Sequence, residues 1–173
     1  MNEAFENLLS RRSVKGYKPD MVPEEIIEQI IQAGLYAASG MNRQDTVILA
    51  VTRKETRDQL SALNARVRGF DKDPFYGAPV VLVVLADKGC GTYLYDGSLT
   101  MGNLMNGAHA LGVDSCWIHG AKEEFEDPEG KALLKELGLT GDYEGIGHCI
   151  LGYRQTEYPA AAPRKENRVF YIK

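Results

Sequence analysis

The chain has 173 residues, a formal net charge of −4, 44% hydrophobic residues and 25% charged residues. This length suits one domain with a sizeable core, and the composition is ordinary for a globular protein. The acidic balance argues against a general affinity for nucleic acid, which usually needs a net basic surface.

The cysteine pattern and the lengths of the apolar runs indicate the cellular compartment. The three cysteines, Cys90, Cys116 and Cys149, lack metal-like CxxC spacing, which argues against a disulfide framework and a structural zinc site. Residues 1–10 do not resemble a secretory signal. No stretch approaches the roughly 18 apolar residues of a membrane-spanning helix. We therefore expect a reducing, cytoplasmic setting without a membrane partner.

Two helices are predicted at the start of the chain. Residues 2–10 form the first. Pro23 opens the second, because its missing N–H costs nothing in a first helical turn. Apolar residues then recur at helical spacing, and the helix is expected to end near residues 38–40.

The rest of the chain alternates apolar runs with amphipathic segments. We expect strands at 46–51, 79–86, 113–118 and 146–153, helices at 53–67, 96–111 and 127–138, and an extended tail at 154–173. The run 79–86 is unbroken and β-branched, as suits a strand covered on both faces. Asp96 is the expected cap of the long helix, whose small residues suit close approach of another backbone. This order by itself favours an α/β layered structure with a more parallel sheet and helices on both sheet faces.

Two basic clusters are candidate phosphate sites. The first combines three cations and a hydroxyl: Arg11, Arg12, Ser13 and Lys15. Such a group holds a phosphate well, although composition alone favours a solvated charged turn. The second cluster, Arg164 and Lys165, lies in the tail. It is an exposed basic turn unless the tail returns to Arg11, in which case the two clusters form a phosphate clamp.

A polar turn follows the second helix. It contains small residues and amides: Ala38, Ser39, Gly40, Asn42 and Gln44. Amides suit the donor and acceptor edges of a heterocycle, whereas the alternative interpretation is an ordinary helix C-terminal turn.

The segment 115–120 ends a predicted strand, where ligands of α/β sheets commonly bind. Cys116 and His119 suggest a thiol nucleophile with a base. Strand alternation, however, places these two side chains on opposite faces, so inert buried thiols are expected at Cys116 and Cys149. His109 is interpreted as a structural histidine.

No dinucleotide fingerprint is complete. Gly145-Ile146-Gly147 lacks a third glycine and precedes a strand rather than opening a helix. A Rossmann-type nicotinamide site and a P-loop are therefore not expected.

Together these segments resemble the FMN-dependent nitroreductase family in its short single-domain form, over essentially the whole length. The resemblance is carried, in chain order, by RRSVK, ASGMNRQ, FYGAPVVLVV, DGSLTMGNLMNGAHALGVDSCWIHG, and GYR followed by PRK. It implies an α+β three-layer sandwich with a central, mainly antiparallel sheet flanked by helices. Residues 1–173 would form a single FMN-binding domain, with 154–173 as a tail contributing to the phosphate site.

The resemblance also implies an activity. NAD(P)H would reduce FMN at N5 by hydride transfer in a ping-pong cycle, and nitroaromatics, quinones or similar acceptors would reoxidise it. The flavin carries the chemistry, so no catalytic side chain is needed. The flavin would lie at the interface of a homodimer.

The family pattern assigns cofactor-binding roles to three groups of residues. Arg11, Arg12, Ser13, Lys15, Arg164 and Lys165 would contact the FMN phosphate and ring edge; Ala38, Ser39, Gly40, Asn42 and Gln44 would reach the flavin of the other subunit; and backbone groups of Ile118, His119 and Gly120 would border the reactive edge, one N–H facing N5. One departure concerns Gln44, which is followed by Asp45 and Thr46 where many members have proline and an aromatic residue.

Two rival functions remain open at this point. One is a flavin-binding carrier or sensor without turnover. The other is a thiol-dependent hydrolase that uses Cys116 or Cys149 with His119 or His148.

Overall fold

The computed structural model describes residues 2–173, so Met1, the first residue of the expected domain, lies outside the described residues. A four-stranded sheet with the order β1-β2-β4-β3 forms the centre. The strands are β1 (Thr46–Val51), β2 (Val80–Asp87), β3 (Asp114–Ile118) and β4 (Tyr143–Gly152), and every neighbouring pair is antiparallel.

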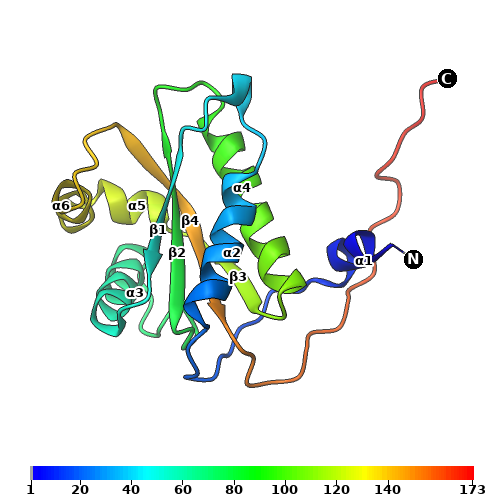
Figure 1. Cartoon of the computed structure of the whole chain (residues 1–173), viewed down its shortest axis with the longest axis horizontal. Coiled ribbons are helices and arrows are strands. Elements are labelled where there is room, and N and C mark those ends of the chain that lie inside the picture. The colour runs from blue at the N-terminus through cyan, green and yellow to red at the C-terminus, as the bar shows by residue number, and fades with distance from the viewer. Residues whose placement is uncertain (1) are drawn as a thin grey trace.

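Helices cover both faces of this sheet (Figure 1). One face carries α2 (Glu24–Leu35) and α4 (Tyr93–Ala110), and the other carries α3 (Lys54–Arg68), α5 (Ala121–Glu126) and α6 (Pro128–Glu136). The α+β sandwich implied by the resemblance is therefore confirmed. The parallel arrangement favoured by the order of elements alone is wrong.

The antiparallel pairing of β1 and β2 follows from the path of the connection between them. The chain leaves β1 at Val51 and re-enters the sheet beside it, because Val51 is the register partner of Val81. Helix α3 and the loop 69–79 thus return to the end of the sheet from which they started. Element order does not reveal this return, because it depends on how the loop folds back.

The core has two layers, one on each sheet face. Strand β2 is the central element, since Val80 to Ala86 are all fully buried. Its unbroken apolar run is explained by helices on both faces. On the face covered by α2 and α4, these two helices pack against each other. A Cβ at Gly107 would come within 2.7 Å of the Ala33 Cβ. The small residues of α4 therefore do permit close helix approach, as expected.

Several element boundaries differ from the prediction. Helix α2 ends at Leu35, before the polar turn, and α4 begins at Tyr93, so Asp96 lies inside the helix and is not its cap. The carboxylate of Asp96 instead accepts hydrogen bonds from the Thr92 hydroxyl and the Gly40 N–H. Helix α5 was not predicted, because six residues are too few to display a helical period.

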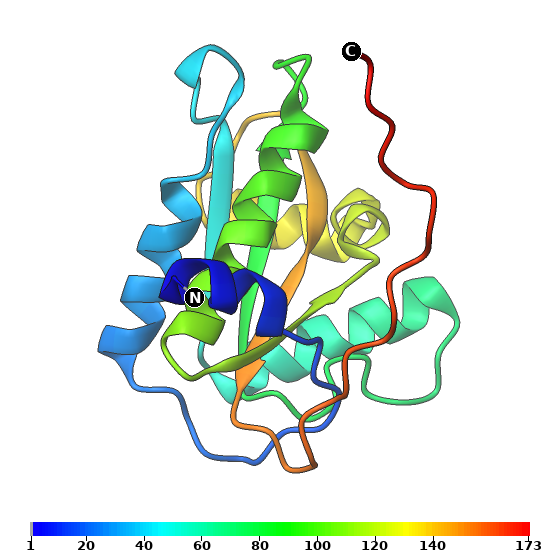
Figure 2. The same ribbon diagram turned by 90° about the vertical axis from the view of Figure 1, so that its right-hand side faces the viewer.

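The two ends of the chain lie apart from the sandwich. Helix α1 (Glu3–Ser10) sits outside α4, and the tail after β4 is extended (Figures 1 and 2). Tyr158 is the anchor of the tail: its hydroxyl accepts a 2.7 Å hydrogen bond from the Arg12 N–H, and its ring lies parallel to that of His109. Beyond residue 158 the side chains are exposed.

Candidate functional site

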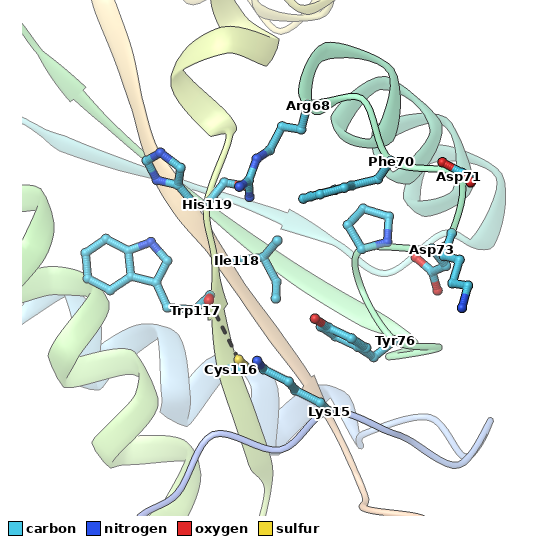
Figure 3. Close-up of a pocket in the computed structure, with 12 residues that line it drawn as sticks. Lys15, Arg68, Phe70, Asp71, Asp73, Tyr76, Cys116, Trp117, Ile118 and His119 are labelled. Atoms are coloured by element: carbon cyan, nitrogen blue, oxygen red, sulfur yellow. Dashed lines mark hydrogen bonds between the residues drawn. The ribbon is translucent and has the colours of Figure 1, made fainter.

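A cavity of about 550 Å³ opens beside β3, between the N-terminal segment and the α3–β2 loop. This volume lies in the range of small-molecule sites. Its aromatic and charged lining includes Lys15, Arg68, Phe70, Asp73, Tyr76 and Trp117, together with Cys116, Ile118 and His119 of β3 and its end. In Figure 3, Phe70 and Tyr76 flank the opening, Ile118 points toward it, and Trp117 and His119 project to the other side of the strand.

The N-terminal segment is held against β3 by backbone pairing. Ser13 forms a parallel bridge with Ser115, and the Val14 N–H donates to the Ser115 carbonyl at 3.1 Å. This pairing brings Lys15 to the cavity, where its ammonium lies 5.8 Å from the ring centroid of Tyr76. Of the residues proposed from sequence, Lys15, Ile118 and His119 therefore meet at one cavity.

Arg11 and Arg12 each carry a buried guanidinium nitrogen without a partner among the described residues: Arg11 Nη1 and Arg12 Nε. Arg12 also donates through Nη1 to the carbonyls of Leu9 and Arg11, both at 2.8 Å. A buried donor without an acceptor is costly, so these nitrogens are suited to an anionic ligand.

The α3–β2 loop forms the opposite wall and is organised by Asp73. This carboxylate accepts hydrogen bonds from Arg57, from the Ser61 hydroxyl and from the N–H groups of Phe75 and Gly77. Burial raises the pKa of Asp73, but these hydrogen bonds outweigh it and hold the pKa below its usual value. Arg57 is only 8% exposed and also donates to the Ala78 carbonyl, so a side chain of α3 holds the loop in place.

Seven lining residues of this wall were not proposed as site residues: Arg68, Phe70, Asp71, Lys72, Asp73, Pro74 and Tyr76. Tyr76 lies within the segment FYGAPVVLVV that carries the resemblance, where it has no assigned role. A sequence clue existed in the aromatic residues of GFDKDPFYG, which are unusual in an exposed loop. Tyr76 has a φ of +53°, an uncommon conformation for a bulky residue that often marks a functional site.

The polar turn predicted to bind the cofactor lies elsewhere. It follows the C-terminal end of α2, whereas the Arg11–Lys15 segment precedes the N-terminal end. The 12-residue helix α2, about 18 Å long at 1.5 Å per residue, lies between the two segments in the chain. Within the turn, Gln44 donates from its N–H to the Ser39 hydroxyl and from its amide to Asn42. Met41, Asn42 and Gln44 all have positive φ values, so the turn holds a strained conformation.

Arg164 and Lys165 lie in the exposed tail. Arg164 hydrogen-bonds the carbonyl of Ala162 within the tail itself. Within residues 2–173, no hydrogen bond or ion pair joins Arg164 or Lys165 to the Arg11 cluster. One copy of the chain thus brings together part of the expected site and leaves the polar turn and the tail cations apart from it.

The cysteines have the properties of inert core residues. All three are free and buried. Burial raises the pKa of the Cys116 thiol, and the Ser13 hydroxyl with the charges of Lys15 and Arg11 offsets this only in part. Burial likewise raises the pKa of Cys149. Because the thiolate is the nucleophile, these directions argue against thiol catalysis.

The structure explains His109 and the Gly145-Ile146-Gly147 motif without a role in binding. His109 lies 2.8 Å from the Ser10 hydroxyl through Nε2 and thereby joins α1 to α4. Gly145 and Gly147 lie inside β4, not at the start of a helix. No group of three or more potential metal ligands occurs within residues 2–173, and no helix in this range is both long and apolar enough to cross a membrane.

Comparison with known proteins supplies independent information. The sequence matches the profile of the nitroreductase family over residues 8–153. A nitroreductase with bound FMN from Bacteroides fragilis superposes with a TM-score of 0.89 at 26% identity, covering 100% of both chains. A second one with bound FMN, from Desulfitobacterium hafniense, gives 0.88 at 26% identity, again over 100% of both chains. The FMN reductase (NAD(P)H) of Bacillus subtilis is 33% identical over 87 residues, which are 50% of this chain and 33% of that protein.

Proposed function

Because this chain belongs to the nitroreductase family, we propose that it is an FMN-dependent oxidoreductase that uses NAD(P)H to reduce nitroaromatics, quinones or similar acceptors. The observation that carries the proposal is the cavity beside β3. There Lys15, aromatic side chains and the end of a strand surround a space of about 550 Å³. Arg11 and Arg12, which precede Lys15 in the same segment, each carry a buried nitrogen without a partner among the described residues. The two structural neighbours with bound FMN support the choice of cofactor.

The residues around the cavity fit FMN by their chemistry. Arg11 and Arg12 supply charged donors for a phosphate, and their unpartnered nitrogens give this assignment a physical basis. Ser13 adds a hydroxyl, and Lys15 lies at the cavity, where a cation suits the polar edge of a flavin ring. Residues 1–173 are proposed to form one FMN-binding domain whose tail contributes Arg164 and Lys165 to the phosphate site.

The bound flavin would supply the chemistry, which is acceptance of a hydride at N5 and its release to the acceptor. The protein's task is then to bind and orient. Phe70 and Tyr76 offer aromatic faces at the cavity opening, against which flat molecules stack. Ile118 and His119 border the same space, and the backbone at Ile118, His119 and Gly120 is proposed to face the reactive edge.

A homodimer is part of the proposal, because one copy leaves the site incomplete. The cavity lining includes none of the polar-turn residues Ala38, Ser39, Gly40, Asn42 and Gln44. A second copy that presents this turn to the cavity would complete the site. The left-handed conformations of Met41, Asn42 and Gln44 suit a turn that is shaped for binding.

The distribution of exposed apolar side chains supports the same assembly. Large apolar side chains are exposed on α1 (Phe5, Leu8, Leu9), on α4 (Leu94, Tyr95, Leu99) and in the tail (Val169, Phe170, Tyr171, Ile172). Exposed apolar surface on this scale is typical of an interface. A second copy that covers α1 and α4 and receives the tail would bury it.

Two rivals are weaker. The thiol hydrolase is disfavoured because burial raises the pKa of both candidate thiols, and because His148 is engaged by Glu124 and Ile118. The carrier or sensor differs from the proposal only in the absence of turnover.

Buried free thiols suit a reducing compartment, and a cytoplasmic location remains part of the proposal.

The test is a visible absorption spectrum of the purified protein, recorded anaerobically before and after addition of NADH or NADPH. A yellow protein bleached by one nicotinamide supports the oxidoreductase and identifies its donor. A yellow protein that stays yellow with both would favour the carrier or sensor. A colourless protein that does not bind added FMN would remove the proposal.

A further inference from the structure

Two ionisable side chains lie fully buried behind the cavity wall, although the proposed chemistry does not use them. Glu124 of α5 and His148 of β4 are both 0% exposed, and Nε2 of His148 lies 2.8 Å from Oε2 of Glu124. The other ring nitrogen, Nδ1, lies 3.3 Å from the carbonyl oxygen of Ile118 at the end of β3. The pair therefore connects α5, through β4, to the strand end that borders the cavity.

The protonation pattern of this contact follows from the partners. A carbonyl oxygen only accepts, so Nδ1 of His148 carries a proton and donates it to Ile118. The 2.8 Å contact between Nε2 and Oε2 of Glu124 holds the ring in this orientation. Glu124 thus fixes the tautomer and direction in which His148 reaches Ile118.

The Ile118 carbonyl determines the direction of the next N–H. A trans peptide unit is planar, and its C=O and N–H point in opposite directions. Because the Ile118 carbonyl points at the buried His148, the N–H of His119 points away from the core. Among residues 2–173 that N–H donates no hydrogen bond, so it is available to an acceptor.

The next peptide unit, between His119 and Gly120, is held by a side chain of α3. Nδ2 of Asn64, a fully buried residue of α3, donates to the His119 carbonyl at 3.0 Å. Gly120, with a φ of +104°, lets α3 approach this closely, since a Cβ there would lie 2.7 Å from Nδ2 of Asn64. The two peptides after Ile118 are therefore clamped by side chains from β4 and α3.

We propose that His148, oriented by Glu124, is a positioning residue that fixes the His119 N–H toward the cavity, where it meets an acceptor on the flavin ring. This inference rests on the proposed function for the identity of the acceptor. The positioning itself concerns the protein alone. In this arrangement the pair sets the orientation of the backbone on which cofactor binding depends.

A role in packing alone does not account for the pair. Replacing a buried ion pair with apolar side chains of similar volume is often neutral or stabilising. Here Glu124 also leaves its Oε1 buried without a partner among the described residues, which costs stability. What the pair provides that leucines would not is a side-chain N–H directed at the Ile118 carbonyl, in addition to the strand pairing of Ile118 with His148.

The experiment compares three variants with the wild type, in the apoprotein and after addition of FMN. His148→Leu removes the donor, and His148→Asn keeps an N–H near the position of Nδ1. Cys149→Ala perturbs the neighbouring residue of β4, whose side chain belongs to the core layer on the other sheet face. The amide ¹H and ¹⁵N chemical shifts of His119 are measured by NMR in the apoprotein, and the dissociation constant and absorption maxima of FMN are measured by titration.

We expect His148→Leu to change the amide chemical shifts of His119, to raise the Kd for FMN about tenfold, equal to about 1.4 kcal/mol, and to shift the flavin absorption. His148→Asn should restore most of these properties, and Cys149→Ala should change none of them. Unchanged His119 shifts and Kd in His148→Leu, or an equal effect of Cys149→Ala, would overturn the proposal. If His148→Leu does not fold, Glu124→Leu/His148→Leu takes its place, because it leaves no unpaired buried charge.

The experiment distinguishes failure of the proposed function from failure of the positioning by His148. A wild-type protein that does not bind FMN removes the proposed function, whereas a change in the His119 amide shifts in His148→Leu alone still supports the positioning. Normal FMN binding in a His148→Leu variant with wild-type His119 shifts removes the positioning and leaves the proposed function intact.

Discussion

The backbone N–H of Gly40 donates a 3.1 Å hydrogen bond to Oδ1 of Asp96, across 56 residues of sequence. The other oxygen of this carboxylate accepts a 2.8 Å hydrogen bond from the Thr92 hydroxyl. Asp96 is only 4% exposed. One buried side chain in the first turn of α4 therefore anchors the strained polar turn that follows α2.

Replacing Asp96 with alanine is expected to release this turn. The loss of its buried hydrogen bonds should lower the free energy of unfolding by about 1–3 kcal/mol. Because the turn is proposed to contact the flavin of the second subunit, FMN should also bind more weakly. Urea unfolding and FMN titration measure the two effects. Ser98→Ala is the control, since Ser98 is exposed on the same helix and bonds only to Leu94. A destabilised Asp96→Ala protein with unchanged FMN affinity would confine the turn to a structural role.

The phosphate assignment predicts that Arg11→Ala/Arg164→Ala loses FMN readily. Each hydrogen bond from a charged group contributes about 1.5–3 kcal/mol, so losing even one should raise the Kd by more than about tenfold. Fluorescence titration with FMN gives the value. Arg66→Ala is a matched control, because Arg66 pairs with Asp127 and Glu129 on the surface. Wild-type affinity in the double variant would remove both residues from the phosphate site.

Truncation after Tyr158 is expected to weaken the dimer and FMN retention together. It removes the four exposed apolar side chains Val169 to Ile172 and the cations Arg164 and Lys165, while keeping the contacts of Tyr158 with Arg12 and His109. Sedimentation velocity over a concentration series reports the assembly. The substitution of Phe170 and Ile172 by serine in the full-length chain separates the apolar contribution from the cationic one. A truncated protein that remains dimeric would show that α1 and α4 suffice for the interface.

Acid should destabilise the α3–β2 loop through Asp73. The folded-state pKa of this carboxyl lies below its usual value, so the unfolded chain takes up the proton first as pH falls. Its contribution to stability is therefore complete above the unfolded pKa, about 3.9, and is lost as pH falls through the folded pKa.

Urea unfolding at pH 6 and pH 3 tests this direction. Asp73→Asn should be less stable than wild type at pH 6 and should lose less stability between the two pH values. Asp71→Asn, in the same exposed loop, serves as the comparison. An identical loss of stability in wild type and Asp73→Asn would mean that other carboxyls account for the acid sensitivity.

Much of the secondary structure followed from local patterns. The strand at 46–51 was predicted with its observed boundaries, because the run is apolar and β-rich and has clear breaks on both sides. Asp127 caps α6 as expected, since its side chain accepts from the Glu129 N–H. The motifs also carried the resemblance to the family, because they depend on residue order and spacing.

Other features depended on the fold. The role of Asp96 as the anchor of Gly40 arises from a contact between distant segments, so a local capping rule misassigned it. The antiparallel sheet required the return of loop 69–79 to the end of β1. That same return brings Phe70 and Tyr76 to the cavity, and their contribution was not foreseen for this reason.

The sequence by itself therefore determined the family, the main helices and strands, and Lys15, Ile118 and His119 as residues of one site, because these rest on short-range patterns and ordered motifs. Only the tertiary structure decided which walls enclose that site and that Glu124 and His148 support the end of β3. It also decided that the polar turn lies at the opposite end of α2. Such relationships join residues far apart in the chain, and they are set by packing and buried hydrogen bonds that no local pattern encodes.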